Sequence, residues 1–218
     1  MEYNDYYLHT NYYLNLIRSR LSKLKLRIKG LFRNDLDYLN DYSDDLCGPI
    51  ISNSLESLIG YLDDFDLMNL SVVEDDSEYI YTYVITPLAN DNIISIVSAR
   101  VGYIEPNVKL SKSVPPNQHM YIDFGCSYQS SKYSKLAGGI NYYIRAYIII
   151  LALKRFNIKI IYGHVSGDIG GDPNILRQYH IKRGCQFYKK TDIYYCNVET
   201  FLDTFFKLQF PNYNKLKE

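Results

Sequence analysis

Two glycine-bearing loops carry most of the side chains through which this sequence could do chemistry. The first loop, residues 129–139, ends in a glycine pair between a predicted strand and a predicted helix. Glycine lets the backbone approach a ligand closely, and the first amides of a helix favour a phosphate. Lys132 and Lys135 add positive charge. The spacing matches neither the dinucleotide-binding fingerprint nor the P-loop, so the loop is either a phosphate-binding turn or a plain connection.

The second loop, residues 163–172, leads into a helix that carries a candidate acid. Asp172 and Pro173 form a favourable start for a helix that the pattern extends from Asn174 to Lys182. This helix brings Tyr179 toward the end of the sheet, where a phenol, protonated at neutral pH, could act as a general acid. Packing is the competing interpretation, because the chain contains 24 tyrosines.

Strands and helices in a fixed order position these two loops. An aromatic and β-branched run at 79–86 and an apolar run at 93–104 predict a hairpin. The further predicted elements are a strand at 119–128, a helix at 140–156, a strand at 158–164, a helix at 174–182, strands at 186–190 and 192–198, and a helix at 199–208. A hairpin followed by a β-α-β unit predicts an α/β fold with a mixed, mostly antiparallel central sheet and helices on both faces.

The N-terminal region is predicted to be helical and basic. Apolar residues three and four apart predict an amphipathic helix from Thr10 to Arg33. Such a helix packs on the domain, binds nucleic acid, coats a membrane surface or docks on a partner, and packing is the interpretation we favour. An acidic connector, Asp35–Pro49, and a second helix, Asn53–Leu70, follow. We therefore divide the chain into a helical region, 1–70, and an α/β domain, 71–218.

The net charge of zero conceals a segregation of charge along the chain. Residues 6–33 contain 7 Lys and Arg and no acidic residue, whereas residues 34–99 contain 14 Asp and Glu and no Lys, Arg or His. Residues 100–218 contain 17 Lys and Arg against 8 Asp and Glu. An anionic ligand would be drawn to this C-terminal half, unless the acidic middle simply neutralises the two basic ends within one fold.

Composition also bears on compartment and metals. The 4 cysteines lack metal-ligand spacing, which predicts reduced thiols and no metal site. No signal peptide is recognisable, and the longest apolar run, Ala146–Leu153, falls short of the roughly 20 residues of a membrane span. We expect a soluble cytoplasmic protein without a transmembrane segment. Richness in Ile, Asn and Tyr indicates an AT-rich genome such as that of a virus, for which the compartment would be the host cytoplasm.

A motif in the first loop resembles that of the GNAT family of N-acetyltransferases. The family places the pyrophosphate of acyl-CoA on a loop of pattern Arg/Gln-x-x-Gly-x-Gly/Ala, between its fourth strand and the next helix. At that point this chain reads Lys135-Leu136-Ala137-Gly138-Gly139-Ile140. Lysine thus replaces the usual Arg or Gln, and Ile140 occupies the last small position. The order of elements is also similar, and the resemblance covers about residues 79–198.

A second motif is similar to a later family pattern. That pattern is an Asn, an apolar stretch, a Tyr, and then Lys-x-Gly-Phe, and residues 174–187 of this chain match it loosely. Tyr179 stands one residue farther from Gly184 than in the family pattern, so His180 could occupy its slot.

The resemblance implies an enzyme that moves an acetyl group from acetyl-CoA to a primary amine of a protein or small molecule. It implies that Lys135–Ile140 bind the pyrophosphate, that Asn174 lies near the pantetheine arm, and that Tyr179 protonates the leaving thiolate. Asp123, or Glu105 before it, is a candidate general base, although no motif identifies either.

Two further points stay open at this level. The acidic residues between 35 and 78 could attract a cationic amine. The alternative to an enzyme is a catalytically inactive GNAT-like structural or interaction protein, for example a viral one. Ile140, in place of a small residue, favours this alternative.

Overall fold

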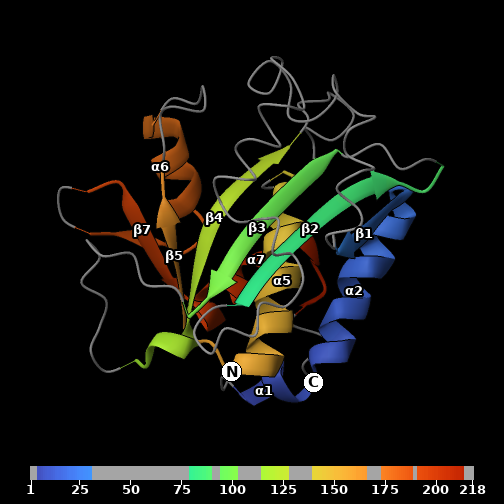
Figure 1. The fold of residues 1–218 in the computed structure, drawn as a ribbon. Coiled ribbons are helices and arrows are strands. Elements are labelled where there is room, and N and C mark those ends of the chain that lie inside the picture. The colour runs from blue at the N-terminus through green and yellow to red at the C-terminus, as the bar shows by residue number, and fades with distance from the viewer. Residues whose placement is uncertain are drawn as a thin grey trace.

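The computed structural model describes residues 4–30, 79–89, 94–102, 114–127, 139–165, 173–188 and 191–213. In these ranges the strands form a seven-stranded sheet of order β1-β2-β3-β4-β5-β7-β6 (Figure 1). The strands are β1 (Leu26–Gly30), β2 (Tyr79–Pro87), β3 (Ser95–Val101), β4 (His119–Ser127), β5 (Ile160–His164), β6 (Gln186–Phe187) and β7 (Ile193–Asn197). The helices are α1 (Asn4–Leu8), α2 (Thr10–Lys23), the 3-10 turn η4 (Pro116–Gln118), α5 (Asn141–Phe156), α6 (Pro173–Ile181) and α7 (Val198–Gln209).

The described sheet is mixed and mostly antiparallel, as the sequence predicts. Strands β4 and β5 are parallel, and the other neighbouring strands of the described sheet are antiparallel. The predicted hairpin is confirmed, since β2 pairs with β3 from Tyr79 opposite Val101 to Ile85 opposite Ser95. The parallel pair is joined through α5, which is the crossover that a parallel connection requires.

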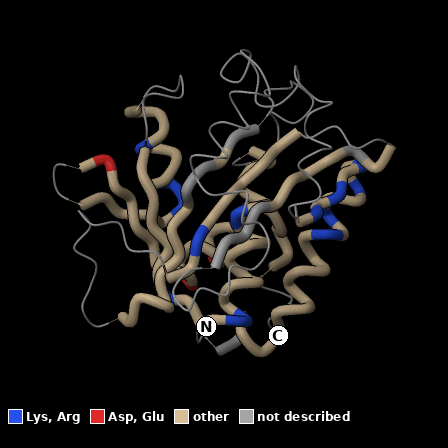
Figure 2. The backbone as a smooth tube through the Cα atoms, viewed as in Figure 1, with Lys and Arg blue, Asp and Glu red and all other residues tan. Residues whose placement is uncertain are grey.

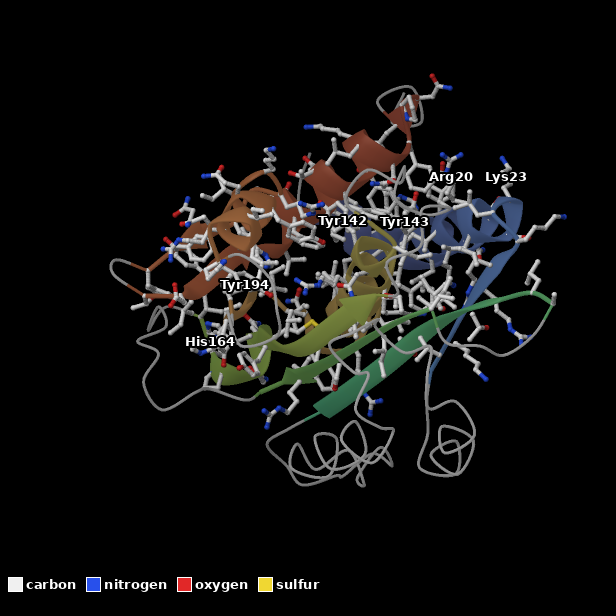
Figure 3. All side chains as sticks on the ribbon, turned by 90° about the horizontal axis from the view of Figure 1, so that it is seen from above. Arg20, Lys23, Tyr142, Tyr143, His164 and Tyr194 are labelled. Carbon is white, nitrogen blue, oxygen red and sulfur yellow. The ribbon has the colours of Figure 1, made fainter. Side chains whose placement is uncertain are left out.

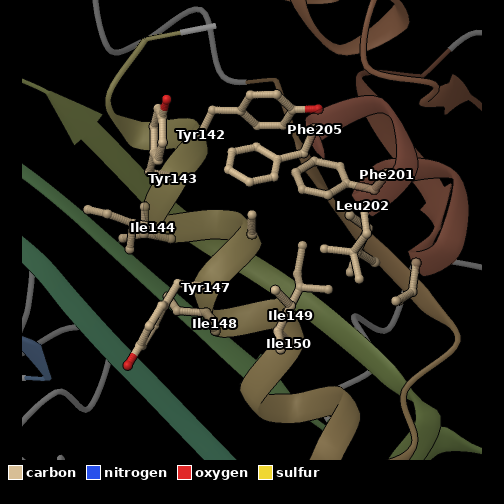
Figure 4. Packing of buried hydrophobic residues seen from close by; sticks show 14 of the residues in the cluster. Tyr142, Tyr143, Ile144, Tyr147, Ile148, Ile149, Ile150, Phe201, Leu202 and Phe205 are labelled. Carbon is tan, nitrogen blue, oxygen red and sulfur yellow. The ribbon is translucent and has the colours of Figure 1, made fainter. Parts of the chain in front are cut away.

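Helix α5 lies at the centre of the core. Ten of its 16 residues are buried, because it packs on β2, β3 and β4 as well as on α2 and α7. A helix that is apolar on most of its circumference is expected to be enclosed in this way. Figure 4 shows Tyr142 and Tyr143 of α5 beside Phe205 of α7, with ring centroids 4.9 Å and 5.3 Å from that ring. This packing fixes the first turn of α5 against α7.

The two ends of the described chain meet in one aromatic cluster. The Tyr6 hydroxyl of α1 donates to Asp203 of α7 at 2.6 Å and lies 2.5 Å from the hydroxyl of Tyr213. The Tyr13 ring of α2 packs on Phe206 of α7 at 4.9 Å. Residues 4–30 therefore share a core with the α/β sheet. The predicted boundary at residue 70 lies outside the described residues and stays a prediction.

The predicted helix from Thr10 to Arg33 is wrong over residues 24–30, and residues 31–33 lie outside the described residues. Helix α2 ends at Lys23, Lys25 has a φ of 62°, and β1 then pairs antiparallel with β2. The physical reason is visible in the sequence, because apolar and basic residues alternate strictly over residues 24–29. That period of two is typical of a strand. Leu26 of β1 is accordingly 1% exposed in the core.

Basic residues recur along α2 and β1 in this N-terminal segment (Figure 2). The stripe of α2 packs on the domain through Leu14, Ile17 and Leu21, which are all buried. Contact of residues 10–33 with nucleic acid or a membrane surface stays a prediction. The predicted acidic connector and the predicted helix at 53–70 lie outside the described residues, as does Glu105. In the described part of the chain, no helix has the length and apolar character that a membrane crossing demands.

Candidate active site

The candidate site lies where the parallel strands β4 and β5 stop pairing. Their ladder runs from His119 opposite Ile160 to Ile122 opposite Gly163. Strand β5 ends one residue later at His164, whereas β4 continues to Ser127. Beyond Ile122, the described part of β5 therefore supplies no ladder partner to β4. A strand edge of this kind can pair with an extended ligand or another chain.

A β-bulge marks the same point of β4. Opposite β3, Ala99 pairs with Ile122 and Ser98 pairs with Phe124, so Asp123 is the extra residue of the bulge. A bulge bends its strand and increases the local twist. The bend coincides with the last paired position of β4 and β5, which explains why the two strands separate there.

Two strand glycines let side chains come close to this point. A Cβ on Gly125 of β4 would lie 3.1 Å from the side chain of Asn141 and 3.2 Å from Nη2 of Arg145. A Cβ on Gly163 of β5 would lie 2.7 Å from the hydroxyl of Tyr194, closer than real Cβ atoms come. Glycine at these two positions therefore allows α5 and β7 to place polar groups against the ends of β4 and β5.

Those polar groups form a largely buried cluster that we call the arginine cluster, comprising Tyr142, Arg145, Tyr179, His180, Arg183 and Tyr194. Arg145 donates through Nε to Asn141 at 2.8 Å and through Nη1 to the Tyr194 hydroxyl at 3.3 Å. The Arg183 guanidinium lies 3.2 Å from the ring centroid of Tyr179 and 4.6 Å from that of Tyr142. Figure 3 shows Tyr194 well apart from Arg20 and Lys23 of α2, with Tyr142 between them.

His180 and Tyr194 stack in this cluster and are both held neutral. Their rings lie 3.8 Å apart at 20°. Burial, reinforced by the charges of Arg145 and Arg183, lowers the pKa of His180 to about 2. Burial raises the pKa of Tyr194 to about 12, although Arg145 acts in the opposite direction. The Tyr194 phenol therefore keeps its proton at neutral pH and can donate it.

Solved structures share this fold, although no protein-family model and no curated protein sequence matches the chain. FdhC, described as a nucleotide-linked sugar GNAT in its apo form, aligns with a TM-score of 0.50 at 14% identity over 87% of this chain and 94% of its own. The chain has the GNAT fold. AAC(6')-Ib in complex with ribostamycin and coenzyme A aligns with a TM-score of 0.48 at 14% identity over 81% of this chain and 96% of that chain. A dodecameric spermidine N-acetyltransferase from Vibrio cholerae aligns with a TM-score of 0.44 at 13% identity, over 82% of this chain and 97% of that chain.

The predicted pyrophosphate loop of this GNAT fold is described only at its end. Lys135, Leu136, Ala137 and Gly138 lie outside the described residues, and Gly139 and Ile140 lead into α5. Gly139 has a φ of 71°, a conformation that glycine adopts without strain. Ile140, the departure from the family pattern, is 3% exposed and belongs to the core. Its side chain thus packs in the core immediately before α5.

The predicted catalytic residues approach the site from two elements of the GNAT fold. Tyr179 of α6 is half-buried, and its ring packs against Arg183 inside the arginine cluster. Asp123 takes the bulge position of β4. Asn174 is exposed in the first turn of α6, outside that cluster. The structure thus brings Tyr179 into the cluster and places Asp123 at the strand ends, while the predicted roles of all three remain predictions.

Arg145, Arg183 and Tyr194 were not among the residues that the sequence singled out. Two signals could have found them. Arg145 is the only charged residue of the long apolar helix before its last turn, and a charge at such a position is rarely withdrawn from solvent without a reason. Gly125 and Gly163 are isolated glycines in strands, which indicate that another group approaches the backbone closely.

Proposed function

We propose that this chain is an acyl-CoA-dependent N-acyltransferase that moves an acetyl group from acetyl-CoA to a primary amine. One observation carries the proposal most directly. In a GNAT fold, β4 bends at Asp123 and loses its β5 partner beyond Ile122, beside the amino-terminal end of α5. An unpaired strand edge offers hydrogen bonds to an extended pantetheine arm, and a helix amino end favours phosphate.

The residues of the chain would divide the work as follows. The backbone amides of Lys135–Ile140 would hold the pyrophosphate, and Asn174 would lie near the pantetheine arm. Acetyl-CoA itself supplies the reactive thioester, so the protein mainly orients the two substrates. Asp123, on the bulge, would accept a proton from the amine.

Two phenols are candidates for the acid that protonates the leaving thiolate. Tyr179 is the one that the family resemblance implies, and it lies against Arg183. Tyr194 is the one whose hydroxyl lies directly against β5, at Gly163. Both are held near guanidinium groups, which would stabilise the phenolate that forms when the proton leaves.

Binding of acetyl-CoA tests the proposal before any acceptor is known. Acetyl-CoA at about 100 times its Kd should stabilise the fold by about 2.7 kcal/mol, measurable as a rise in Tm. Gly138→Glu, which adds a negative charge to the predicted pyrophosphate loop, should abolish that rise. Leu8→Glu is the matched control, because Leu8 is exposed at the end of α1. Asn11, three residues later in α2, accepts a hydrogen bond from Lys154 in the last turn of α5, at the opposite end of that helix from the loop. Thiol release on a panel of amines then measures turnover.

Three outcomes are informative. Binding with turnover on an amine supports the enzyme. Binding without turnover on a broad panel supports the inactive GNAT-like protein. The absence of any binding to acetyl-CoA or CoA by calorimetry, with a folded protein, would refute the proposal.

A further inference from the structure

Two guanidinium groups lie beside the candidate site without a carboxylate partner. Arg183 is buried at 6% exposure, and Arg145 is half-buried, with contacts to Tyr194 of β7 and to the position of Gly125 on β4. In the described part of the chain, the ion pairs are Arg177 with Asp192 and Lys207 with Asp203, so neither Arg145 nor Arg183 has one. Burying a charge is costly unless it is paired, and two cations close together increase that cost.

The contacts that these arginines do make satisfy them only in part. Arg183 donates through Nη1 to the carbonyl oxygen of Tyr179 at 2.5 Å and packs on two phenol rings. Its Nε is buried and has no hydrogen-bond partner, and the same holds for the hydroxyl of Tyr142. Cation–π contacts stabilise a guanidinium but accept no N–H hydrogen bond at its edge. The cluster therefore has donors in excess of acceptors.

Three titratable groups beside the two arginines add no negative charge. From α6 comes His180, which is neutral because burial lowers its pKa to about 2, and from β7 comes Tyr194, whose pKa burial raises to about 12. Burial also raises the pKa of Tyr142, so that phenol is neutral as well. The site thus presents two cations, a neutral imidazole and the hydroxyls of three tyrosines at the ends of β4 and β5.

We propose that the arginine cluster is a subsite for a carboxylate carried by one of the two substrates of the proposed acyl transfer. The inference rests on that proposed function and names the chemistry of its substrate. A carboxylate accepts several hydrogen bonds through two oxygens, matches a guanidinium edge, and neutralises buried positive charge. The carboxylate comes either from a dicarboxylic acyl group on CoA or from an amino-acid acceptor, since both would reach the ends of β4 and β5.

Matched ligand pairs on the wild-type protein separate these two sources. On the acyl side, succinyl-CoA is compared with butyryl-CoA, which has a methyl group in place of the carboxylate, by calorimetry. On the acceptor side, glycine and lysine are compared with glycinamide and lysinamide, with acetyl-CoA as donor, by initial rate. A preference of about tenfold for the carboxylate member of one pair is the expected result.

Variants tie the preference to the cluster. Arg145→Gln should remove the tenfold preference, and Arg145→Lys should retain part of it, because the charge remains but the fork of donors is lost. Arg155→Gln is the matched control, since Arg155 is exposed in the last turn of the same helix, and it should leave the preference unchanged. If Arg145→Gln does not fold, the ligand pairs on the wild type and Arg145→Lys decide the question.

The outcomes distinguish a failure of this inference from a failure of the proposed function. Binding of acetyl-CoA without a preference in either ligand pair overturns the carboxylate subsite and leaves the transferase standing. If no CoA thioester binds, the proposed function fails, and the subsite is then decided by titrating the protein with succinate and with succinamide at constant ionic strength. A rise in Tm with succinate alone, absent in Arg145→Gln, supports the subsite, and equal effects of the two compounds overturn it.

Discussion

Replacing His180 should change how the free energy of unfolding depends on pH. The imidazole is 5% exposed, stacks on Tyr194, and has a pKa lowered to about 2 by burial and by Arg145 and Arg183. In the unfolded chain the same group has a pKa near 6.5. Between these two values the unfolded state binds a proton that the folded state does not bind, so stability falls as the pH falls below 6.5.

The magnitude follows from that difference. The slope is about 1.4 kcal/mol for each pH unit, and the loss between about pH 7.5 and about pH 5 amounts to about 2 kcal/mol from this one group. The groups that face His180 do not add to it in this range, because the two arginines stay charged and Tyr194 stays neutral. His180→Phe keeps the stacked ring and removes the titration.

Urea unfolding followed by circular dichroism at several pH values measures the effect. The free energy of unfolding of His180→Phe, relative to the wild type, should rise by about 2 kcal/mol between about pH 7.5 and about pH 5. Gln178→Ala, on the exposed side of the same helix, removes no titratable group and should show a constant difference. His180→Asn serves as a second variant if the phenylalanine does not fit. A difference for both variants that stays constant with pH would show that His180 is not held neutral.

Three further substitutions test the packing that holds the site. Gly163→Ala should lower the free energy of unfolding by about 2 kcal/mol, because the new Cβ would lie 2.7 Å from the Tyr194 hydroxyl. Denaturant unfolding measures this loss, and an unchanged free energy of unfolding would contradict the close approach. Phe205→Ala should lower the free energy of unfolding by about 4 kcal/mol, because the fully buried Phe205 ring packs on Tyr142 (Figure 4). A decrease in Tm as small as that of a surface substitution would contradict this packing. Tyr6→Phe should lower the free energy of unfolding by about 2 kcal/mol, because it removes the hydroxyl that donates to Asp203. A variant with the same Tm as the wild type would contradict that hydrogen bond.

The element order from residue 79 to residue 209 could be predicted because the sequence signals there are local. The hairpin of β2 and β3 has turn residues between two β-branched runs, and α5 has an apolar stretch long enough for only one interpretation. The error fell at residues 24–29, where leucine and isoleucine positions satisfy the helical spacing and the alternation of a strand at once. Pairing with β2, which is distant in sequence, decides for the strand.

The candidate site could be predicted only where one element carries it. The turn before α5 and the helix with Tyr179 are visible as local motifs, whereas the arginine cluster joins α5, α6 and β7. Contacts between elements that are far apart in sequence leave no fixed spacing. The only local traces are the glycines that make room for them, Gly125 and Gly163.

The position of Ile140 bears on whether the loop before α5 can serve a ligand. In the sequence, a bulky residue at the last small position of the motif favours an inactive protein, because bulk facing the ligand would block it. In the structure, the side chain of Ile140 is 3% exposed within the core, so its volume lies on the side of the core. The backbone amides of a first helical turn are independent of the side chain that carries them. Isoleucine at this position therefore removes neither the amides nor the helix dipole, and it is compatible with a phosphate at the amino end of α5.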